Sequence, residues 1–181
     1  MPQSKGQRTP AKARTAGTTA TGRGGQPAPA PAGPRWGVPT PFVVVSLVLS
    51  LAGLGISTYL TIAHYNTGVV LSCPNTGVIN CAKVTSSAQS SLLGIPVALL
   101  GLLFYVGMTV LCLPQAWARQ RLILVRLGAA ATGILFVFYL VYAELFILDA
   151  ICLWCTSVHV VTLLLFGTIL FATAVDPRRL E

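Results

Sequence analysis

Charged side chains are scarce in this sequence, and acidic ones especially so. Of the 181 residues, 9% are charged and only four are Asp or Glu, whereas 54% are hydrophobic. A water-soluble domain usually has about a quarter charged residues. A chain of this size cannot bury so much apolar surface in a core of its own. The composition therefore excludes an ordinary soluble domain and indicates lipid as the surroundings.

Several familiar catalytic signatures are also missing. The sequence has no internal repeat, no P-loop, no dinucleotide-binding fingerprint and no histidine-rich metal motif. Nothing therefore points to a nucleotide-dependent enzyme or to a histidine-based metal site. Chemistry has to be sought in other residue types, and the five cysteines are the first candidates.

Long apolar runs are what the sequence has instead. A helix needs about 20 apolar residues to cross the hydrocarbon core of a bilayer. Four segments come close to this length or exceed it, namely residues 42–63, 95–113, 122–143 and 151–175. Helices satisfy their own backbone groups in lipid. We therefore predict an all-α fold, a polytopic membrane four-helix bundle over residues 41–176.

Positive charge is plentiful, with a net charge of +8, but it is unevenly placed. Six of the twelve Lys and Arg residues precede Trp36, and only Lys83 lies in the 64–94 loop. Five of the other six lie around the join between the second and third apolar runs or after the fourth. They are Arg119, Arg121, Arg126, Arg178 and Arg179. The positive-inside rule then predicts that both termini are cytoplasmic and that the long 64–94 loop is exoplasmic. The charge indicates topology rather than nucleic-acid binding.

The two ends of the chain have the composition of tails. Residues 1–40 are rich in Ala, Gly, Pro, Thr and Arg and contain no acid, which predicts a disordered basic cytoplasmic tail. An organelle transit peptide is the alternative for this segment. Residues 177–181 form a short second cytoplasmic tail in this interpretation.

The predicted topology places four of the five cysteines on one side. Cys73 and Cys81 lie in the exoplasmic loop, where Pro74, Asn75 and Gly77 between them predict a turn. Cys152 and Cys155 open the fourth apolar run. Disulfides form and persist on that side. Cys112 falls at the opposite end of the second run, where we expect it to be a small packing residue.

The "CLWC" pair is poorly placed for a structural disulfide and well placed for a redox-active one. Residues i and i+3 share a helix face, so a disulfide between Cys152 and Cys155 constrains almost nothing in the fold. A helix N-terminus favours a thiolate. Asp149 has the spacing of an N-cap, our first interpretation of it. A plain structural disulfide for the loop pair and a four-cysteine zinc site remain as alternatives.

Two disulfide-capable pairs on one face suggest a relay by thiol–disulfide exchange, with a mobile loop bringing one pair to the other. Because the second pair lies at the membrane edge, a membrane quinone suits the role of acceptor. Its pocket would lie between the outer helix ends. Candidate lining residues are Trp154, Phe146, Tyr139, Tyr142 and His159. His159 is ionisable within an apolar run, which favours a functional role, although an interhelical hydrogen bond is an equal alternative.

Four features, in order, resemble the vitamin K epoxide reductase family in its bacterial form. They are "CPNTGVINC", "AKVTSS", "SLLGIPVALLG" with Gly94 and Pro96 opening a helix, and "CLWCTSVHV", within about residues 40–175. The resemblance implies a quinone-dependent disulfide oxidase in the cell membrane, with its active site facing outward. Such enzymes reoxidise a thioredoxin-fold partner that puts disulfides into exported proteins.

Carried over by position, the resemblance gives each cysteine a role. Cys73 would exchange with the reduced partner, and Cys81 would pass the electrons to Cys152. Cys155 would face the quinone, menaquinone or ubiquinone, and form a transient adduct or charge-transfer species with it. Ser87 would hydrogen-bond a quinone carbonyl and stabilise developing negative charge there.

The chain also departs from the family. Many bacterial members have a fifth helix and a fused thioredoxin-like domain, whereas this sequence ends six residues after Val175, so we expect a separate DsbA-like partner. His159 stands where mammalian members have Tyr, and their quinone-contacting Asn has no clear match, which leaves the substrate open. A quinone-epoxide reductase and a non-enzymatic assembly protein with structural disulfides are the alternatives. We expect no metal and no nucleic-acid partner.

Overall fold

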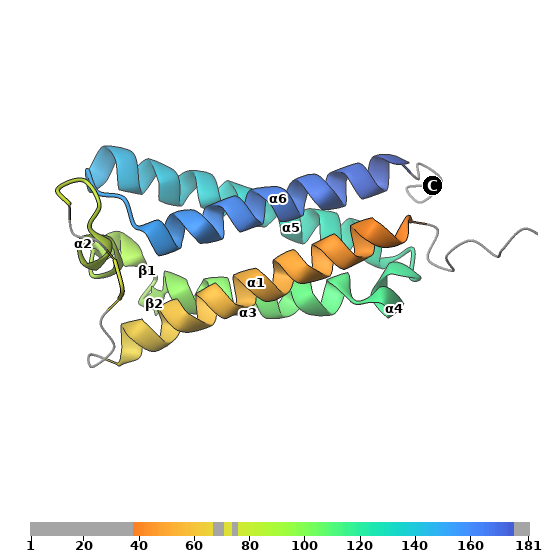
Figure 1. The fold of residues 1–181 in the computed structure, drawn as a ribbon, viewed down its shortest axis with the longest axis horizontal. Helices are drawn as coiled ribbons and strands as arrows, with labels where there is room; N and C mark the ends of the chain where they lie inside the picture. Colours follow the sequence, from red (N-terminus) through yellow and green to blue (C-terminus); the bar gives the residue numbers. More distant parts are fainter. Residues whose placement is uncertain (1–37, 67–70, 74–75, 176–181) are drawn as a thin grey trace, which may run out of the picture. The chain divides into compact units, whose positions relative to one another are not determined.

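The computed structural model describes residues 38–66, 71–73 and 76–175, and this part is mostly helical (Figure 1). Its elements in chain order are α1 (Thr40–Tyr65), α2 (Cys81–Thr85), η1 (Ala88–Ser90), β1 (Ser91–Leu92), β2 (Ile95–Pro96), α3 (Val97–Cys112), α4 (Pro114–Trp117), α5 (Leu122–Tyr142), the π-helical η2 (Ala143–Ile147) and α6 (Leu153–Val175). Most of the predicted tail over residues 1–40, and all of residues 177–181, lie outside the described residues.

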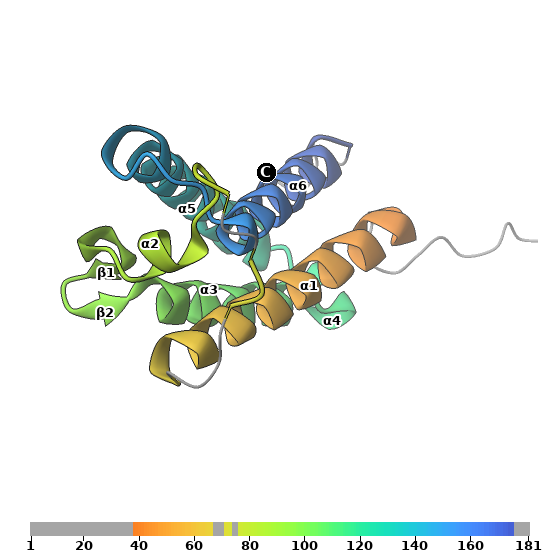
Figure 2. The same ribbon diagram turned by 60° about the vertical axis from the view of Figure 1, so that its left-hand side comes forward.

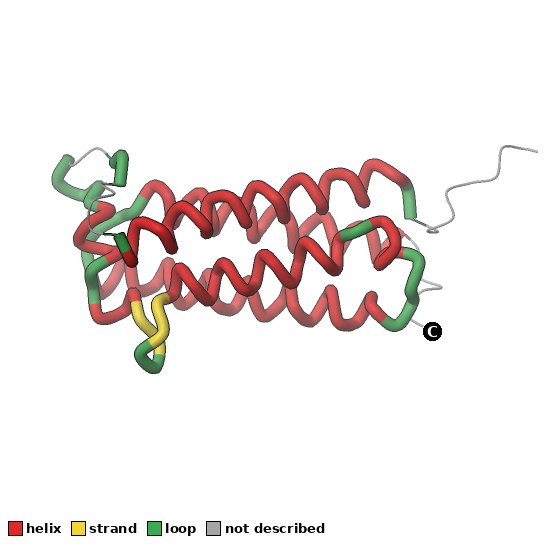
Figure 3. Tube along the Cα trace, turned by 90° about the horizontal axis from the view of Figure 1, so that it is seen from below, coloured by secondary structure: helices red, strands yellow, loops and turns green. Residues whose placement is uncertain are grey.

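Three helical segments in the described part are long and apolar enough to cross a membrane: Thr40–Tyr65, Leu122–Ile147 and Leu153–Val175. They match three of the predicted runs, and Figure 3 shows the long helices lying side by side. The fourth, α3, has 16 residues. At 1.5 Å per residue it measures roughly 24 Å, against a hydrocarbon core of about 30 Å. That α3 crosses the membrane, and that both termini are cytoplasmic, stay predictions.

Small residues let α1 approach α3 closely. Ser46, Ser50, Gly53 and Ser57 are buried along one face of α1. A Cβ atom added at Gly53 would overlap the ring of Tyr105 on α3. Stripes of small residues permit this kind of close helix packing in lipid, where no hydrophobic force drives helices together. Tyr105 also extends across to α6, since its hydroxyl lies 2.8 Å from the Thr162 Oγ1 atom.

The outward surface of the helices is apolar. Large aliphatic and aromatic side chains are exposed on every long helix, among them Val48, Leu103, Leu135, Phe138 and Phe171. A soluble protein rarely exposes a continuous apolar surface of this kind. The pattern suits helices whose outer faces contact lipid.

An arginine is buried at the end of the helices far from the 64–94 loop. Arg126 of α5 is fully buried, its Nε and Nη2 atoms donate to the Leu111 carbonyl at 2.9 and 2.7 Å, and its guanidinium lies 3.7 Å from the Trp117 ring centroid. These contacts hold the C-terminal end of α3 against α5. Cys112, next to Leu111, is fully buried in the hydrophobic core.

The loop before α3 is more structured than the sequence indicated. It contains α2, η1 and a hairpin of β1 and β2, which lie at the end of the molecule where α6 begins (Figure 2). Gly94, with φ +81°, completes the tight hairpin turn. Pro96 ends β2 and is the N-cap of α3 rather than its first residue, because the helix begins at Val97.

Candidate functional site

A disulfide joins Cys73 and Cys81 in the loop. Cys81 is the first residue of α2 and is buried. The Asn80 side chain caps this short helix by accepting a hydrogen bond from the Lys83 amide at 2.9 Å. Gly77 has φ +57° in the turn between the cysteines, so the predicted role of this glycine as a turn residue is confirmed. The other predicted turn residues, Pro74 and Asn75, lie outside the described residues.

Backbone hydrogen bonds attach the Cys81 arm of this loop to the segment before α6. The Ile151 amide donates to the Val78 carbonyl at 2.9 Å, and the Asn80 amide donates to the Ile151 carbonyl at 3.1 Å. Ile79 and Ile151 thereby form a parallel bridge. Since Ile151 immediately precedes Cys152, and Asn80 immediately precedes Cys81, the bridge brings the two cysteines together.

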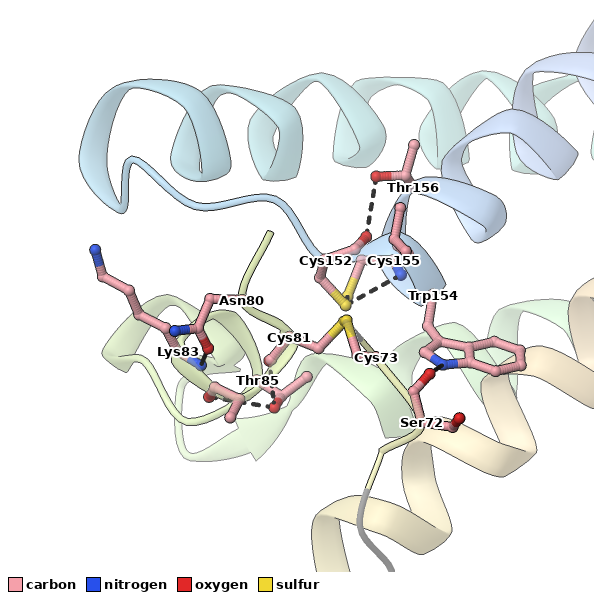
Figure 4. The surroundings of a disulfide bond; sticks show 12 residues. Ser72, Cys73, Asn80, Cys81, Lys83, Thr85, Cys152, Trp154, Cys155 and Thr156 are labelled. Atoms are coloured by element: carbon pink, nitrogen blue, oxygen red, sulfur yellow. Dashed lines mark hydrogen bonds between the residues drawn. A yellow bond between two sulfur atoms is a disulfide. The ribbon is translucent and has the colours of Figure 1, made fainter. Parts of the chain in front are cut away.

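Trp154 attaches the other arm of the loop. Its indole Nε1 donates to the Ser72 carbonyl at 3.1 Å, and its ring packs on Tyr59 with centroids 4.8 Å apart. The Ser72 amide in turn donates to the Tyr59 hydroxyl at 3.4 Å. Ser72 immediately precedes Cys73, so both arms of the disulfide loop are tied to residues beside Cys152 (Figure 4).

Cys152 caps α6. The helix begins at Leu153, and the Cys155 amide donates to the Cys152 sulfur at 3.3 Å, which is the geometry of an N-cap side chain. The prediction that Asp149 is this cap is therefore wrong. Asp149 lies in the preceding turn, at φ +46°, because the helix starts later than the apolar run indicated.

The two sulfurs of the pair are close to bonding distance. They lie 2.8 Å apart, while a disulfide bond is about 2.05 Å long. The hydrogen bond from the Cys155 thiol lowers the pKa of the Cys152 thiol below its ordinary value, and it outweighs burial, which acts in the opposite direction. Cys152 is thus prepared to act as a thiolate.

Cys152 also contacts the loop disulfide. The described part of the chain has a buried apolar cluster formed by Cys81, Val84, Ala150 and Cys152, with Cys73 and Cys155 packed against it. Figure 4 shows the Cys152 sulfur pointing toward the Cys73–Cys81 disulfide. The structure therefore gathers the four predicted catalytic cysteines in one place, although they come from two segments about 70 residues apart.

Cys155 also lines a cavity next to this cluster. The cavity has a volume of about 300 Å³, the low end of the range for ligand sites, and it lies between α1, α3, α5 and α6 under the η1 segment. Its wall is largely apolar, with polar side chains that include Ser87, Gln89, Thr132, Glu144 and His159. Cys152 does not line it.

Of the predicted quinone ligands, Ser87 and His159 line this cavity. Ser87 donates its hydroxyl hydrogen to the Val84 carbonyl at 2.8 Å, so it must turn to reach a ligand. His159 is buried in α6, one turn after Cys155.

The other predicted ligands do not line the cavity. Trp154 contacts the loop instead, as described above. Tyr142 and Phe146 are exposed on the outer face and stack on each other, with centroids 5.1 Å apart. Tyr139 is exposed as well. Tyr139, Tyr142 and Phe146 occupy positions on the outward face of their helical segment. Composition alone does not show which face a residue occupies.

Several polar residues of the cavity were not among the sequence candidates, and Gln89 and Glu144 are two of them. Gln89 follows the predicted Ser87, and Glu144 comes directly after the third apolar run. The sequence does contain a feature that could have identified Glu144. No apolar run contains an acid, and only Glu144 and Asp176 directly adjoin one. Within the residues described, no group of three or more His, Cys, Asp or Glu side chains is placed to hold a metal ion.

Most of the sequence matches a known protein family. Residues 44–170 match the Vitamin K epoxide reductase family. The chain belongs to this family. Because the match covers most of the chain and includes all five cysteines, membership identifies the chain as a membrane oxidoreductase. No individual curated protein matches the sequence.

Proposed function

We propose that this protein is a quinone-dependent disulfide oxidoreductase. It takes electrons from a reduced thioredoxin-fold protein outside the membrane and delivers them to a membrane quinone, in support of disulfide formation in exported proteins. The observation that carries the proposal is the position of Cys152. Its sulfur points toward the loop disulfide, and its partner Cys155 lines the cavity.

The first exchange takes place in the loop. A thiolate of the reduced partner attacks the sulfur of Cys73, forms a mixed disulfide and releases Cys81 as a thiolate. The second thiol of the partner then attacks the mixed disulfide, so the partner leaves oxidised and the loop pair is left reduced. Cys81 is buried and Cys73 is not, which supports Cys73 as the sulfur that an external protein meets.

The second exchange moves the electron pair to α6. Cys81 attacks Cys152 of the Cys152–Cys155 disulfide and displaces Cys155. Cys73 then attacks Cys81, which restores the loop disulfide and leaves both α6 cysteines reduced. The structure has this arrangement, with Cys73 and Cys81 joined and Cys152 and Cys155 free. The loop bonds to Ile151 and Trp154 keep Cys81 beside Cys152 without a large movement.

The cavity residues suit a quinone ring. The wall is mainly apolar, and Ser87, Gln89 and His159 can offer hydrogen bonds to ring oxygens. When bound, the quinone supplies an acceptor for two electrons and two protons. Oriented donors at the ring oxygens would stabilise the negative charge that develops there.

The topology belongs to the same proposal. We place the cysteine cluster at the outer face of the cell membrane and the termini on the cytoplasmic side. The distribution of Lys and Arg in the sequence supports this orientation. Lys83 is the only Lys or Arg among residues 64–94, on the side of the cysteines.

A reconstituted assay tests the proposal. Purified protein in lipid vesicles should reduce menaquinone or ubiquinone in the presence of a reduced DsbA-like protein. Cys152→Ser and Cys155→Ser should each abolish this turnover, whereas Cys112→Ala should not, because Cys112 is buried far from the cluster. Normal turnover in both active-pair variants would disprove the relay. Turnover only with a quinone epoxide would assign the chain to epoxide reduction instead.

A further inference from the structure

Glu144 is a buried carboxylate at the end of a helical segment whose outer face is apolar. It lies in η2, where the Leu148 amide donates to the Ala143 carbonyl at 3.0 Å, a five-residue step that marks a π-helical turn. Glu144 is 6% exposed, while its neighbour Phe146 is 72% exposed. The turn therefore directs the acid inward and the apolar side chains outward. Such π-helical turns occur frequently at functional sites.

Glu144 lies within reach of both the cavity and the cysteine pair. It lines the same cavity as Cys155 and His159. The backbone N–H of Cys152 interacts with its carboxylate, and the carboxylate acts electrostatically on the sulfurs of both Cys152 and Cys155. An ionisable side chain inside a membrane-spanning segment is costly, and it is retained mostly where it has a function.

The proposed reaction requires a group that handles protons at this place. Oxidation of two thiols releases two protons, and reduction of a quinone consumes two. The cavity wall is largely apolar, and Glu144 is a titratable group on that wall together with Cys155, so it can carry a proton between the thiols and a ligand in the cavity. We propose that Glu144 accepts a thiol proton from the Cys152–Cys155 pair and returns it to an oxygen of the bound quinone. This inference rests on the proposed function.

The step balances in atoms and electrons. Two S–H bonds break, one S–S bond forms between Cys152 and Cys155, and an electron pair passes to the quinone. The quinone gains two O–H bonds and leaves as hydroquinone. Glu144 takes up one of the two thiol protons and gives it to one ring oxygen, while the other thiol proton goes to the second ring oxygen. The carboxylate is therefore unchanged at the end of the cycle.

Other titratable groups share the cavity with Glu144. They are His64 of α1, Tyr105 of α3, and Cys155 and His159 of α6. Tyr105 is engaged by Thr162, at 2.8 Å. Glu144 differs from these in acting on both sulfurs of the pair, which is the position that a proton acceptor for them requires.

The test compares Glu144→Gln with Glu144→Asp in the reconstituted assay. The amide has the shape of the acid but cannot carry the proton, so Glu144→Gln should lower kcat by about a hundredfold while KM for the quinone stays within about twofold. Glu144→Asp should retain much of the rate. Asp149→Asn is the matched control, since Asp149 is exposed and Asn tolerates its positive φ, and it should behave as the unchanged protein.

A second measurement needs no quinone. Loss of the negative charge at Glu144 should lower the pKa of the Cys152 thiol, because the carboxylate acts to raise it. Thiolate absorbance of the reduced pair against pH should show this shift in Glu144→Gln and not in Asp149→Asn.

The outcomes separate the two proposals. An unchanged protein that never reduces a quinone overturns the proposed function. An active protein whose Glu144→Gln variant keeps its kcat overturns only the role of Glu144. The role of Glu144 would also be overturned if Glu144→Gln turned over slowly only because its KM for the quinone had risen, with no shift in the thiolate titration. That result would show that Glu144 binds the quinone and does not carry a proton.

Discussion

The indole nitrogen of Trp154 donates a hydrogen bond to the carbonyl of Ser72, 82 residues earlier in the chain, at 3.1 Å. This bond ties the Cys73 arm of the disulfide loop to the first turn of α6. On the other arm, the bridge between Ile79 and Ile151 does the same. The loop disulfide is thus fixed beside Cys152 from both sides.

Replacement of Trp154 tests this attachment. Trp154→Phe should keep the ring contact with Tyr59 and lose the bond to Ser72. A hydrogen bond contributes about 0.5–1.5 kcal/mol net, so exchange between the loop pair and the α6 pair should slow by roughly two- to tenfold. Quenched-flow alkylation of the thiols measures this rate. An exchange rate in Trp154→Phe equal to that of the unchanged protein would show that the bond has no part in positioning the loop.

A single-cysteine replacement should trap the intermediate of the relay. In Cys155→Ser the second sulfur of the α6 pair is gone, so the Cys152 thiolate attacks the loop disulfide at Cys81 and releases Cys73. We expect a stable Cys81–Cys152 disulfide, detectable by mass spectrometry of peptides from non-reduced protein. Cys152→Ser is the control and should give no loop-to-helix disulfide, because Cys152 is the cysteine clustered with Cys81. A Cys81–Cys155 disulfide in this control would contradict the prediction, because it would show that Cys155 can exchange with the loop pair in place of Cys152.

The contact between α1 and α3 should be sensitive to one methyl group. Gly53→Ala places a Cβ atom into the ring of Tyr105, whereas a Cβ atom at Gly55 meets nothing within 4 Å. We expect Gly53→Ala to destabilise the folded protein by about 1–3 kcal/mol. Thermal unfolding in detergent measures the loss. Gly55→Ala, exposed on the same helix, should be neutral or slightly stabilising.

The lowered pKa of Cys152 predicts a pH dependence. In protein with Cys73 and Cys81 replaced by Ser, reduced with a dithiol and freed of quinone, the thiolate absorbance of the α6 pair should persist below the pH range of an ordinary thiol. Because the folded pKa is below the unfolded one, the contribution of Cys152 to stability is complete above the unfolded pKa. It is lost as pH falls through the folded pKa. Further replacement of Cys152 by Ser should remove both effects, and an absorbance curve unchanged by that replacement would contradict the assignment.

Much of the architecture could be predicted from local pattern. Apolar run length alone located three long helices, and Gly77 announced its turn. The four cysteines could be grouped because charge placement gave them a common side. These features depend on residues close together in the sequence, or on a simple count of charges.

What the sequence did not reveal depends on direction and on distant contacts. The third run was expected to end at Ala143, because Glu144 is charged, yet the helix continues through η2 to Ile147 and turns that acid inward. Likewise, no pattern marks Ile79 and Ile151 as neighbours, since their bridge is made by backbone groups common to all residues. Helix rotation decided that Tyr142 and Phe146 face outward.

The sulfur of Cys152 that accepts the amide at the start of α6 belongs to the redox couple itself. A thiolate is a better acceptor for that amide than a disulfide sulfur, so the helix end favours the dithiol form. Stabilising the dithiol raises the reduction potential of a pair and makes its disulfide a stronger oxidant. The first turn of α6 therefore favours electron transfer from the loop pair to the Cys152–Cys155 pair, which lies closer to the lipid.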